Sequence, residues 1–549
     1  DLRKKIMKLA TALQDTPELQ AQSYNMIGRI ALDEGFTDKA QLYIEKALKI
    51  EPNNPGILFS YGHICLVKNQ LKTAITFFSK AHSIDPNATN AQSSLAYCYL
   101  ALNDPEKAYL TYNELAKSNP KDNHIKSKLF ESCSKIKADH FTNELYDDLN
   151  YFYEFKGVDF QNLHSLTTSL LILQYELNNE SPPSLDINHL VENKLLINGL
   201  THLLLANPNI EKFLISLRKQ ILFKCIESQG NYNKWLPLIT AIAQQAINNE
   251  QILYIDAQEE IMLNHIQTVI EFDLLNDWSC RSISSALMLF AMYQPLSTLK
   301  NWCNLMDHPV NKWASNTRAL ISRSVWNVNC ELEIAKQFQL NTPLTNTTSI
   351  EVQKQYENHP YPRWLQLGYN TATNYGRALE NEFHRFRAPD YFNHGELKVL
   401  IAGCGTGQHA IKVAKYFRNT KVTAIDLSSR SLAYAKQMAD KLNIHNIEFK
   451  QLDILQLDDT KQYHVIECSG VLHHMQDIQT GFNILKNKLL PGGVMKIGLY
   501  SKEARKVIDK MRNLIETKQI QSDQSGIRLL RFALLQSNKH AFKQLFDST

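Results

Sequence analysis

Hydrophobic and small residues in the first 120 positions recur with a period of 34 residues. Large residues occupy matching places, with Tyr24 and Leu58 early in two periods and Ile44, Phe78 and Tyr112 later in each of three. Four further columns keep the same step: Pro52, Pro86 and Pro120; Ala40, Ala74 and Ala108; Gly28, Gly62 and Ala96; and Ala47, Ala81 and Leu115. The small residues predict helix pairs that cross closely, and the large ones fill the adjoining holes.

A period of 34 with this alternation is typical of tetratricopeptide repeats. We therefore expect residues 1–120 to form an N-terminal α-solenoid, a stack of helix pairs with a concave surface. Two uses of this surface stay open. It captures a peptide or protein, or it serves as an intramolecular brace or dimer contact.

Residues 121–340 show apolar positions at helical spacing and no catalytic motif. We predict an α-helical middle region with helices over 163–177, 190–205 and 210–225, interrupted at Ser181–Pro183, Asn207–Asn209 and Gly230–Asn231. The polar residues 341–350, rich in Thr and Asn, are expected to form a linker.

After the linker, short apolar runs alternate with helical patterns, which predicts a doubly wound, Rossmann-like α/β domain over residues 351–501. The expected strands are 398–402, 421–425, 447–450, 463–468 and 494–500; the expected helices are 408–417, 429–442 and 477–490, followed by a turn at Pro491–Gly493. Residues 502–549 form a C-terminal helical segment, with helices at 502–517 and 526–536 and no obvious strand pair. Either further strands lie beyond this sequence, or these helices replace them.

A glycine-rich loop joins the first expected strand to its helix, in the order Gly403, Cys404, Gly405, Thr406, Gly407 and Gln408. Glycines let the chain turn sharply while its backbone approaches a ligand closely. A dinucleotide site would need GxGxxG, but here Gln408 stands at the sixth position and the third glycine comes one residue early. The spacing GxGxG resembles that of S-adenosylmethionine (SAM)-dependent class I methyltransferases.

Two carboxylates follow the second and third expected strands. Asp426 lies nineteen residues after Gly407, which places it beside the glycine loop with access to both ribose hydroxyls of a bound SAM. Asp453 is placed to meet the adenine amino group. We also expect cofactor contacts from the neighbouring Leu427 and Ile454 and from Ser469, with S-adenosylhomocysteine as the product. Many methyltransferases have an acid two positions before the first glycine; here that position is Ile401.

The segment Tyr356–Trp364 is dense in aromatic residues and prolines. Tyr356, Tyr361 and Trp364 could wall a catalytic pocket for a cation, either the sulfonium or a substrate ammonium. Arg363 could bind the carboxylate of SAM through its two-pronged guanidinium. The alternatives are a segment that packs the domain against the helical region and, for Arg363, a structural ion pair.

The loop after the fourth expected strand, residues 467–474, normally borders the methyl acceptor. His473 and His474 are candidates for a catalytic base or a positioning group. The loop is not the [D/N]PPY of amine-modifying nucleic-acid enzymes, and no proline precedes Cys468 as in cytosine-C5 enzymes. We therefore expect no nucleic-acid substrate.

The net charge and the cysteines bear on the partners and the location that we expect for the protein. A formal charge of +4 over 549 residues is too weak to indicate nucleic acid. Nine cysteines without a CxxC pair predict reduced, buried thiols and a cytoplasmic protein. No apolar run is long enough for a membrane-spanning helix, residues 1–14 lack a signal segment, and no cluster has metal-ligand spacing. We expect no membrane insertion and no metal.

The motif Y-E-x-x-P-Y-P-R-W, at residues 356–364, followed by A-G-C-G-T-G-Q, at 402–408, resembles a bacterial family of tetratricopeptide-repeat methyltransferases. That family includes the rickettsial protein lysine methyltransferases that act on outer membrane protein B. The resemblance implies methylation of lysine Nζ in an outer membrane or other surface protein before export. Two alternatives stay open: a small-molecule O- or N-methyltransferase whose repeats form a homodimer, and a non-catalytic repeat scaffold.

Overall fold

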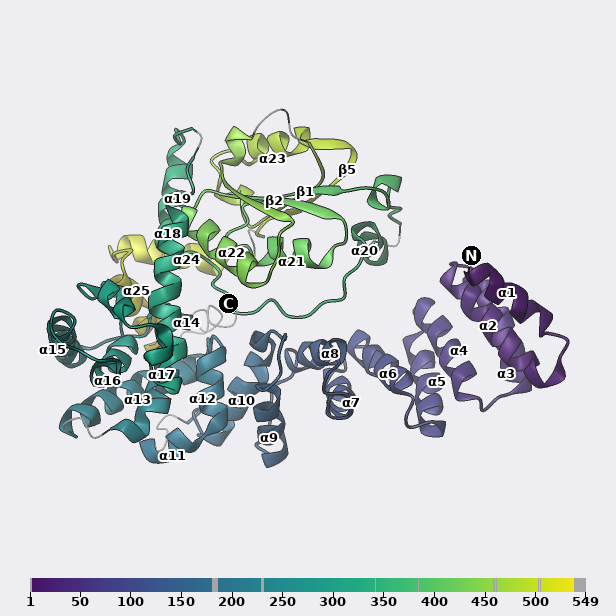
Figure 1. Ribbon diagram of the computed structural model, residues 1–549, viewed down its shortest axis with the longest axis horizontal. Coiled ribbons are helices and arrows are strands. Elements are labelled where there is room, and N and C mark those ends of the chain that lie inside the picture. The colour runs from purple at the N-terminus through teal and green to yellow at the C-terminus, as the bar shows by residue number, and fades with distance from the viewer. Residues whose placement is uncertain are drawn as a thin grey trace. The chain divides into compact units, whose positions relative to one another are not determined.

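The computed structural model describes residues 2–179, 186–228, 232–340, 342–383, 385–457, 460, 462–501, 503 and 505–537. Two compact units divide the chain: residues 1–138 with 156–166, and residues 139–155 with 167–549 (Figure 1). The chain breaks expected at Ser181–Pro183 and Gly230–Asn231 fall wholly or mostly outside the described residues. No helix in the described part of the chain is both long and apolar enough to cross a membrane.

The first unit is a row of antiparallel helices, as the 34-residue period predicts. Its α-helices are α1 (Leu2–Ala12), α2 (Gln20–Asp33), α3 (Thr37–Ile50), α4 (Pro55–Val67), α5 (Leu71–Ile84), α6 (Thr89–Ala101), α7 (Pro105–Ser118) and α8 (Asn123–Cys133). The small residues sit where paired helices cross. A Cβ on Gly28 would lie 2.6 Å from the Ile44 side chain, and one on Gly62 would lie 2.7 Å from Phe78. Glycine is required there because any side chain would push the two helices apart.

The middle region is helical throughout its described residues. Its α-helices are α9 (Asn143–Phe152), α10 (His164–Gln174), α11 (Ile187–Glu192), α12 (Lys194–His202), α13 (Pro208–Glu227), α14 (Leu236–Asn248), α15 (Ala257–Asp273), α16 (Cys280–Ala291), α17 (Ser315–Ile321) and α18 (Asn327–Ala335). The single helix expected over 190–205 is wrong, because Asn193 interrupts it. Its side chain accepts a hydrogen bond from the Leu196 amide and caps α12.

Helix α19 (Thr347–Asn358) begins within the range expected to be a linker. The Asn346 side chain accepts a hydrogen bond from the Ser349 amide at 3.1 Å and caps the helix. Asn and Thr are common both in loops and at helix starts, so composition alone does not separate the two.

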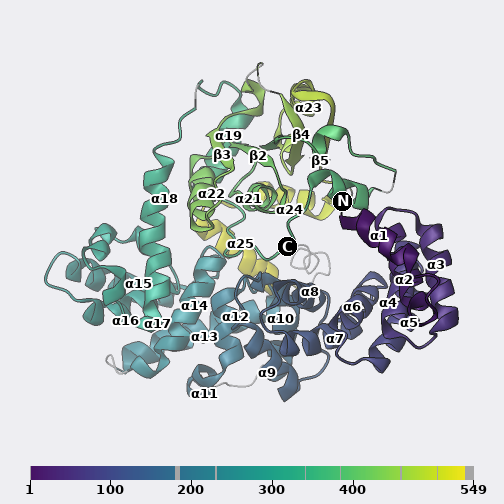
Figure 2. The same ribbon diagram turned by 45° about the vertical axis from the view of Figure 1, so that its right-hand side comes forward.

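The second unit contains a five-stranded parallel sheet in the order β3-β2-β1-β4-β5, which confirms the expected doubly wound α/β class. The strands are β1 (Leu397–Ala402), β2 (Thr420–Asp426), β3 (Ile447–Gln451), β4 (Tyr463–Ser469) and β5 (Leu489–Gly498). Helices α20 (Tyr375–Glu382), α21 (Gln408–Tyr416) and α22 (Ser429–Lys441) cover one face, and α23 (Ile478–Asn487) covers the other (Figures 1 and 2).

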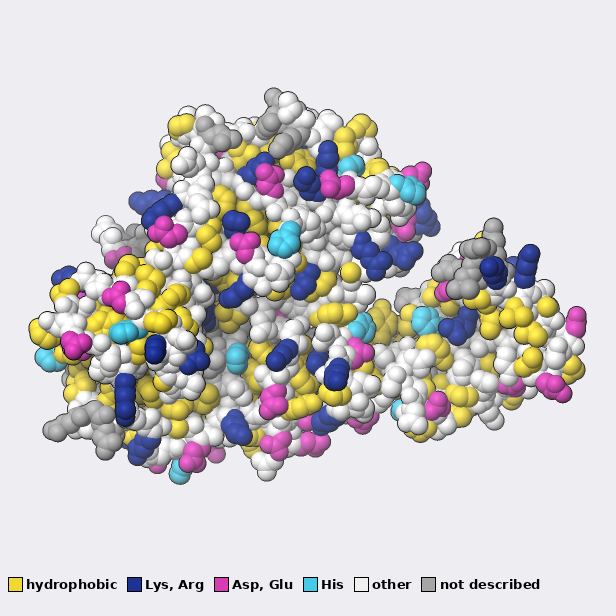
Figure 3. Space-filling model, viewed as in Figure 1, with side chains coloured by type: hydrophobic (Ala, Val, Ile, Leu, Met, Phe, Trp, Pro, Cys, Tyr) yellow, Lys and Arg dark blue, Asp and Glu magenta, His cyan; other side chains and the backbone are white. Residues whose placement is uncertain are grey.

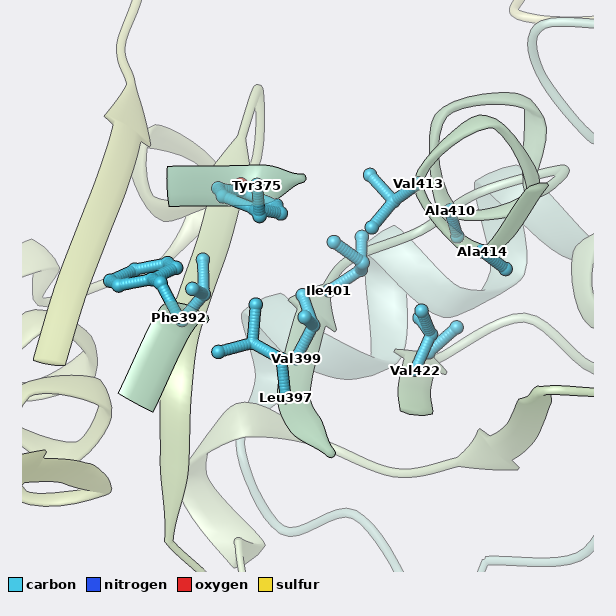
Figure 4. Packing of buried hydrophobic residues seen from close by; sticks show 11 residues of the cluster. Tyr375, Phe392, Leu397, Val399, Ile401, Ala410, Val413, Ala414 and Val422 are labelled. Carbon is cyan, nitrogen blue, oxygen red and sulfur yellow. The ribbon is translucent and has the colours of Figure 1, made fainter. Parts of the chain in front are cut away.

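Alternate residues of β1 fill the cores of the two faces. Ile401 points toward Val413 of α21 and Val399 toward Phe392, in the cluster that also holds Tyr375 of α20 (Figure 4). Leu400 and Ala402 belong to the core on the α23 side. Each strand of a covered parallel sheet is buried on both faces, which explains the continuous apolar run of β1.

The turn expected at Pro491–Gly493 instead lies inside β5 as an irregularity. Tyr463 of β4 pairs with Leu489, but Val465 pairs with Val494, so β5 carries three extra residues between these pairs. Gly492 has a φ of +78°, which a glycine adopts without cost. The sequence signal for a chain reversal is therefore used for a bulge.

Two helices follow the sheet, as expected. They are α24 (Lys506–Thr517) and α25 (Gln524–Gln536). From α25, the buried Arg528 donates to the backbone carbonyls of Gln251 and Tyr293, each at 2.8 Å. Phe532 stacks on Tyr254 with ring centroids 4.0 Å apart. Helix α25 is thus packed into the helical middle of the same unit.

Candidate functional site

Each glycine of the loop between β1 and α21 is required by its backbone angle and its neighbours. Gly403, Gly405 and Gly407 have φ values of +72°, +52° and +79°, in the left-handed region that favours glycine. A Cβ would lie 2.2 Å from Val471 at Gly403, 2.9 Å from the Tyr361 carbonyl at Gly405, and 2.5 Å from Ala435 at Gly407. The loop therefore presents bare backbone at the carboxyl edge of the sheet, where Gln408 begins α21.

Asp426 ends β2 beside this loop, as predicted. Its Oδ2 accepts a hydrogen bond from the Gly405 amide at 2.7 Å, and its Oδ1 accepts one from the Ser428 amide at 3.0 Å. Burial raises the pKa of Asp426, and the backbone amides of Ser428, Gly405 and Leu427 oppose that rise. Each carboxylate oxygen keeps a free lone pair, so both ribose hydroxyls of a cofactor could still donate to it.

Asp453 is buried at the end of β3. Its Oδ1 accepts a hydrogen bond from the Leu455 amide at 2.9 Å and caps the short helix Ile454–Gln456. The Leu427 carbonyl accepts hydrogen bonds from the side chains of Gln353 and Gln451. These positions follow β2 and β3, at the edge where an adenosine would lie.

The Tyr356–Trp364 segment lies along the glycine loop and the start of α22. The Tyr356 carbonyl accepts a hydrogen bond from Ser428 Oγ at 3.0 Å, and the Pro362 carbonyl accepts one from Thr406 Oγ1. Glu357 caps α22: its Oε1 accepts from the Ser429 amide at 2.7 Å, and its Oε2 accepts from the Arg430 amide at 3.1 Å. This capping role was missed from sequence, although Glu is favoured near a helix N-terminus. The N-cap of α22 is Ser428, whose side chain accepts a hydrogen bond from the Ser431 amide.

The side chains of Trp364 and Arg363 are both bound by other residues of the protein. Trp364 is 6% exposed, and its indole nitrogen donates to the Thr406 carbonyl at 3.0 Å beneath the loop. Both Nη atoms of Arg363 donate to Glu331, at 2.9 and 3.0 Å. Glu331 also accepts from Arg430 Nε at 2.9 Å. This geometry favours packing for Trp364 and the structural ion pair for Arg363.

The loop after β4 carries an aromatic cluster. The His473 ring contacts the Tyr500 and His474 rings at tilted angles, with centroids 4.1 Å and 4.3 Å away. Both ring nitrogens of His473 are buried, and neither has a hydrogen-bond partner among the residues the structure describes. Burial, His474 and Arg505 together lower the pKa of His473 to about 4. The imidazole is therefore neutral at physiological pH and a weak base, able to accept a hydrogen bond.

Tyr356 is close both to Tyr500 of this cluster and to the carboxylate of Asp426. Burial and the proximity of Tyr500, Asp426 and Tyr361 raise the pKa of Tyr356. Tyr361 itself is 67% exposed. The structure thus brings Tyr356 close to Asp426 and to Tyr500, which contacts His473. Tyr500 was missed because it is the last residue of the expected fifth strand and matches no motif.

The remaining site residues lie around these groups. Cys404 is half-buried in the loop, and Ser469 is exposed at the end of β4. Burial raises the pKa of Cys468 to about 12, which makes its thiol a poor nucleophile. Two other cysteines, Cys303 and Cys330, are exposed, so the expectation that the thiols are buried is wrong for this pair.

Family models match both parts of the chain. Residues 393–548 match a model described as a methyltransferase domain, and residues 21–54 and 68–129 match models of the tetratricopeptide repeat. The chain therefore carries tetratricopeptide repeats and a methyltransferase domain, and the cofactor of that domain is SAM.

Individual relatives match only in part. An uncharacterized protein of Synechococcus sp. is 31% identical over 188 residues, covering 33% of this chain and 43% of that protein. The ubiquinone biosynthesis O-methyltransferase of Acinetobacter baumannii is 32% identical over 98 residues, covering 18% of this chain and 40% of the enzyme. The solved structure of PKMT2 from Rickettsia typhi in complex with AdoHcy is 23% identical, covers 28% of this chain and 29% of that one, and gives a TM-score of 0.23. The chain spans less than half the length of each of these proteins.

Proposed function

We propose that this protein is an enzyme that transfers the methyl group of SAM to the Nζ atom of lysine in a protein substrate. The observation that carries the proposal is the aromatic cluster of His473, His474 and Tyr500, with Tyr356 close to both Tyr500 and Asp426. Methyl transfer is an in-line displacement, so the enzyme mainly has to position a nucleophile against an already activated methyl group.

A lysine amine must be neutral to attack, yet its ordinary pKa is about 10.4. The proton leaves to solvent, and the cluster holds the amine in place for attack. The neutral imidazole of His473 offers a buried nitrogen without a partner among the described residues. The phenol rings of Tyr356 and Tyr500 offer faces that attract a cation before its proton leaves. SAM, bound by the glycine loop and Asp426, supplies the methyl group.

The repeats support a protein acceptor over a small molecule. On the first helices of two successive repeats, Arg29 and Asp33 of α2 lie close enough to His63 of α4 to affect its pKa, which burial and Arg29 lower and Asp33 raises. A polar surface shared by neighbouring repeats is suited to extended peptide segments. Charged side chains of both signs are interspersed on the face shown in Figure 3, which fits a mixed protein surface better than nucleic acid.

The acceptor class can be tested with isotopically labelled SAM. The full chain is incubated with an outer-membrane protein preparation, with the same preparation after its lysines are acetylated, and with a low-mass cell extract. We expect label on lysine of the untreated proteins, confirmed by mass spectrometry of peptides, and none after acetylation. Label confined to low-mass products would instead support the small-molecule alternative, which the partial likeness to an O-methyltransferase keeps in view.

Variants separate the chemistry from binding. His473→Asn should lower turnover at least tenfold, as the loss of a contact that positions the amine does, with unchanged affinity for S-adenosylhomocysteine. His445→Asn, on an exposed loop, is the matched control. Arg29→Glu should weaken methylation of a protein acceptor and leave cofactor affinity intact. A surface protein as the acceptor, reached in the cytoplasm before export, remains part of the proposal and is supported by the motif resemblance.

A further inference from the structure

Glu467, in β4, is a buried carboxylate to which the methyl-transfer chemistry assigns no role. It is 3% exposed. Its Oε1 accepts a hydrogen bond from the Tyr375 hydroxyl at 2.6 Å, and its Oε2 lies 2.8 Å from His409 Nε2 and 3.7 Å from Lys496 Nζ. Burial acts to raise the pKa of Glu467, but His409, Tyr375 and Lys496 outweigh it and hold the pKa below its usual range. The group is therefore a buried anion.

A buried anion is costly unless it is paired, so its position calls for an explanation. Glu467 lies in register with Ile401 on β1 and with Lys496 on β5. The Ile401 side chain points toward α21, on the face that also holds Tyr375 (Figure 4). Neighbouring residues in register on parallel strands present their side chains on the same face. The carboxylate of Glu467 is thus next to the position where an acid was expected and isoleucine stands.

His409 brings this carboxylate to the start of α21. It is the second residue of that helix and follows the glycine loop directly. Its side chain is 52% exposed and that of Lys496 is 67% exposed, so the cluster reaches the surface although Glu467 does not. A helix N-terminus next to a glycine loop is where the charged tail of a nucleotide-like ligand lies.

The methionine tail of SAM carries an ammonium group that needs an anionic or carbonyl acceptor. Other acids at this edge have different tasks. Asp426 binds the loop amides beside the ribose position, Asp453 caps the helix after β3, and Glu357 caps α22. A carboxylate has about four acceptor positions, and the contacts of Glu467 leave at least one of them open.

We propose that Glu467, positioned by Tyr375 and His409, receives the ammonium of the methionine tail of SAM in place of an acid at position 401. Its negative charge attracts the cation, and the three donors keep it ionised in a buried place. The proposal rests on the methyltransferase part of the proposed function. It is independent of the acceptor, since cofactor binding can be measured without one.

Calorimetry with three ligands tests the assignment on the full chain. S-adenosylhomocysteine carries the ammonium, its deaminated analogue lacks only that group, and 5′-methylthioadenosine lacks the whole tail. We expect Glu467→Gln to weaken S-adenosylhomocysteine at least tenfold and to change methylthioadenosine less than twofold. The deaminated analogue should bind the wild type and the variant equally. Glu448→Gln, an exposed glutamate on β3, is the control and should change none of the three.

Two outcomes would overturn the proposal: unchanged affinity of Glu467→Gln for S-adenosylhomocysteine, or an equal loss for all three ligands, which a purely structural carboxylate predicts. If Glu467→Gln fails to fold, the wild type decides. Equal affinity for S-adenosylhomocysteine and its deaminated analogue would then contradict an ammonium contact. Tyr375→Phe, which keeps the carboxylate and removes one donor, should reduce S-adenosylhomocysteine affinity by a smaller factor than Glu467→Gln and spare methylthioadenosine.

Discussion

Asp426 shows how a side chain is oriented before a ligand arrives. Both of its oxygens are held by backbone amides, one from the glycine loop and one from the start of α22. Both donors belong to the backbone and cannot rotate away, so hydrogen bonds hold the carboxylate on two sides. Little ordering entropy remains to be lost when ribose binds.

Asp426→Asn should therefore weaken S-adenosylhomocysteine by about a hundredfold or more, since two hydrogen bonds to a charged acceptor contribute about 1.5–3 kcal/mol each. The amide is nearly isosteric, but its NH2 must face either the Gly405 or the Ser428 amide, donor against donor. Isothermal titration calorimetry measures the change. Asp440→Asn, on the exposed side of α22, should leave the affinity unchanged.

The pKa of His473 is a second property that can be tested one residue at a time. Because burial, His474 and Arg505 lower it to about 4, stability from the neutral ring is present above pH 6.5 and is lost as pH falls toward 4. Arg505→Gln removes a positive charge and should raise this pKa. NMR titration of histidine-labelled protein measures it, with His473→Asn to assign the signal. A pKa at or above 6.5 in the wild type would contradict the claim that the His473 ring is buried and neutral.

At the scale of elements, the loop between β1 and α21 places two constraints on Gly403. One is its positive φ and the other is the close approach of Val471, and each contributes a different amount to the free energy of unfolding. Gly403→Ala meets both a positive φ and a Cβ 2.2 Å from Val471. We expect it to destabilise the protein by about 2–5 kcal/mol, from about 1–2 for the left-handed backbone and 1–3 for overpacking. Urea denaturation measures the loss.

Gly395→Ala is the matched control for this prediction, because Gly395 has a φ of +85° and nothing within 4 Å of a Cβ. It should show the backbone cost alone, about 1–2 kcal/mol. Val471→Ala should partly rescue Gly403→Ala and leave Gly395→Ala unaffected. Equal losses in the two glycine variants would mean that the contact with Val471 relaxes freely.

Elements were predictable where a local period or cap decides them. The 34-residue columns predicted the helix pairs of the repeats, and the apolar runs predicted the first four strands closely. The fifth strand was placed too late, because it begins at Leu489 and not at residue 494. The single helix over 190–205 failed because Asn193, a polar residue at an ambiguous position, becomes a cap. The turn at Pro491–Gly493 failed because a bulge and a reversal use the same residues.

The site was predictable to the extent that its motif is local in sequence. The glycine loop and Asp426 are adjacent as expected, because the crossover between β1 and β2 fixes their distance. Arg363 was undecidable, since its partner Glu331 lies 32 residues earlier in a region without motifs. Tyr500 and Glu467 gained meaning only from strand register and ring contacts.

At the scale of the whole molecule, α25 joins residues far apart in sequence within the second unit. Arg531 Nε lies 2.8 and 2.9 Å from the two carboxylate oxygens of Glu211, which is buried on α13. Burial raises the pKa of Glu211, and Arg531 opposes that rise. Arg531→Ala should destabilise the protein by about 3 kcal/mol, because it leaves a buried charge unpaired.

The pH dependence of this loss has a definite sign. Without Arg531, the folded-state pKa of Glu211 rises further above its unfolded value, so folded protein binds the proton more tightly. Stability from that proton is present at low pH and is lost as pH rises. Thermal melts should therefore show a larger deficit at pH 7.5 than at pH 5. The double variant Arg531→Ala, Glu211→Gln should recover part of the stability, and a deficit independent of pH would exclude an unpaired glutamate as the cause.

Glu331 limits how this methyltransferase domain could be transferred into another protein. Its single buried carboxylate receives Arg363, from the segment before the sheet, and Arg430, from the first turn of α22. A recombination event or an engineered graft that moved residues 351–501 into another scaffold would carry two arginines away from their shared anion. The inherited unit must therefore include α18. A graft that leaves α18 behind should place two unpaired arginines at the start of α22 and before the sheet, and it should be less stable than one that keeps Glu331.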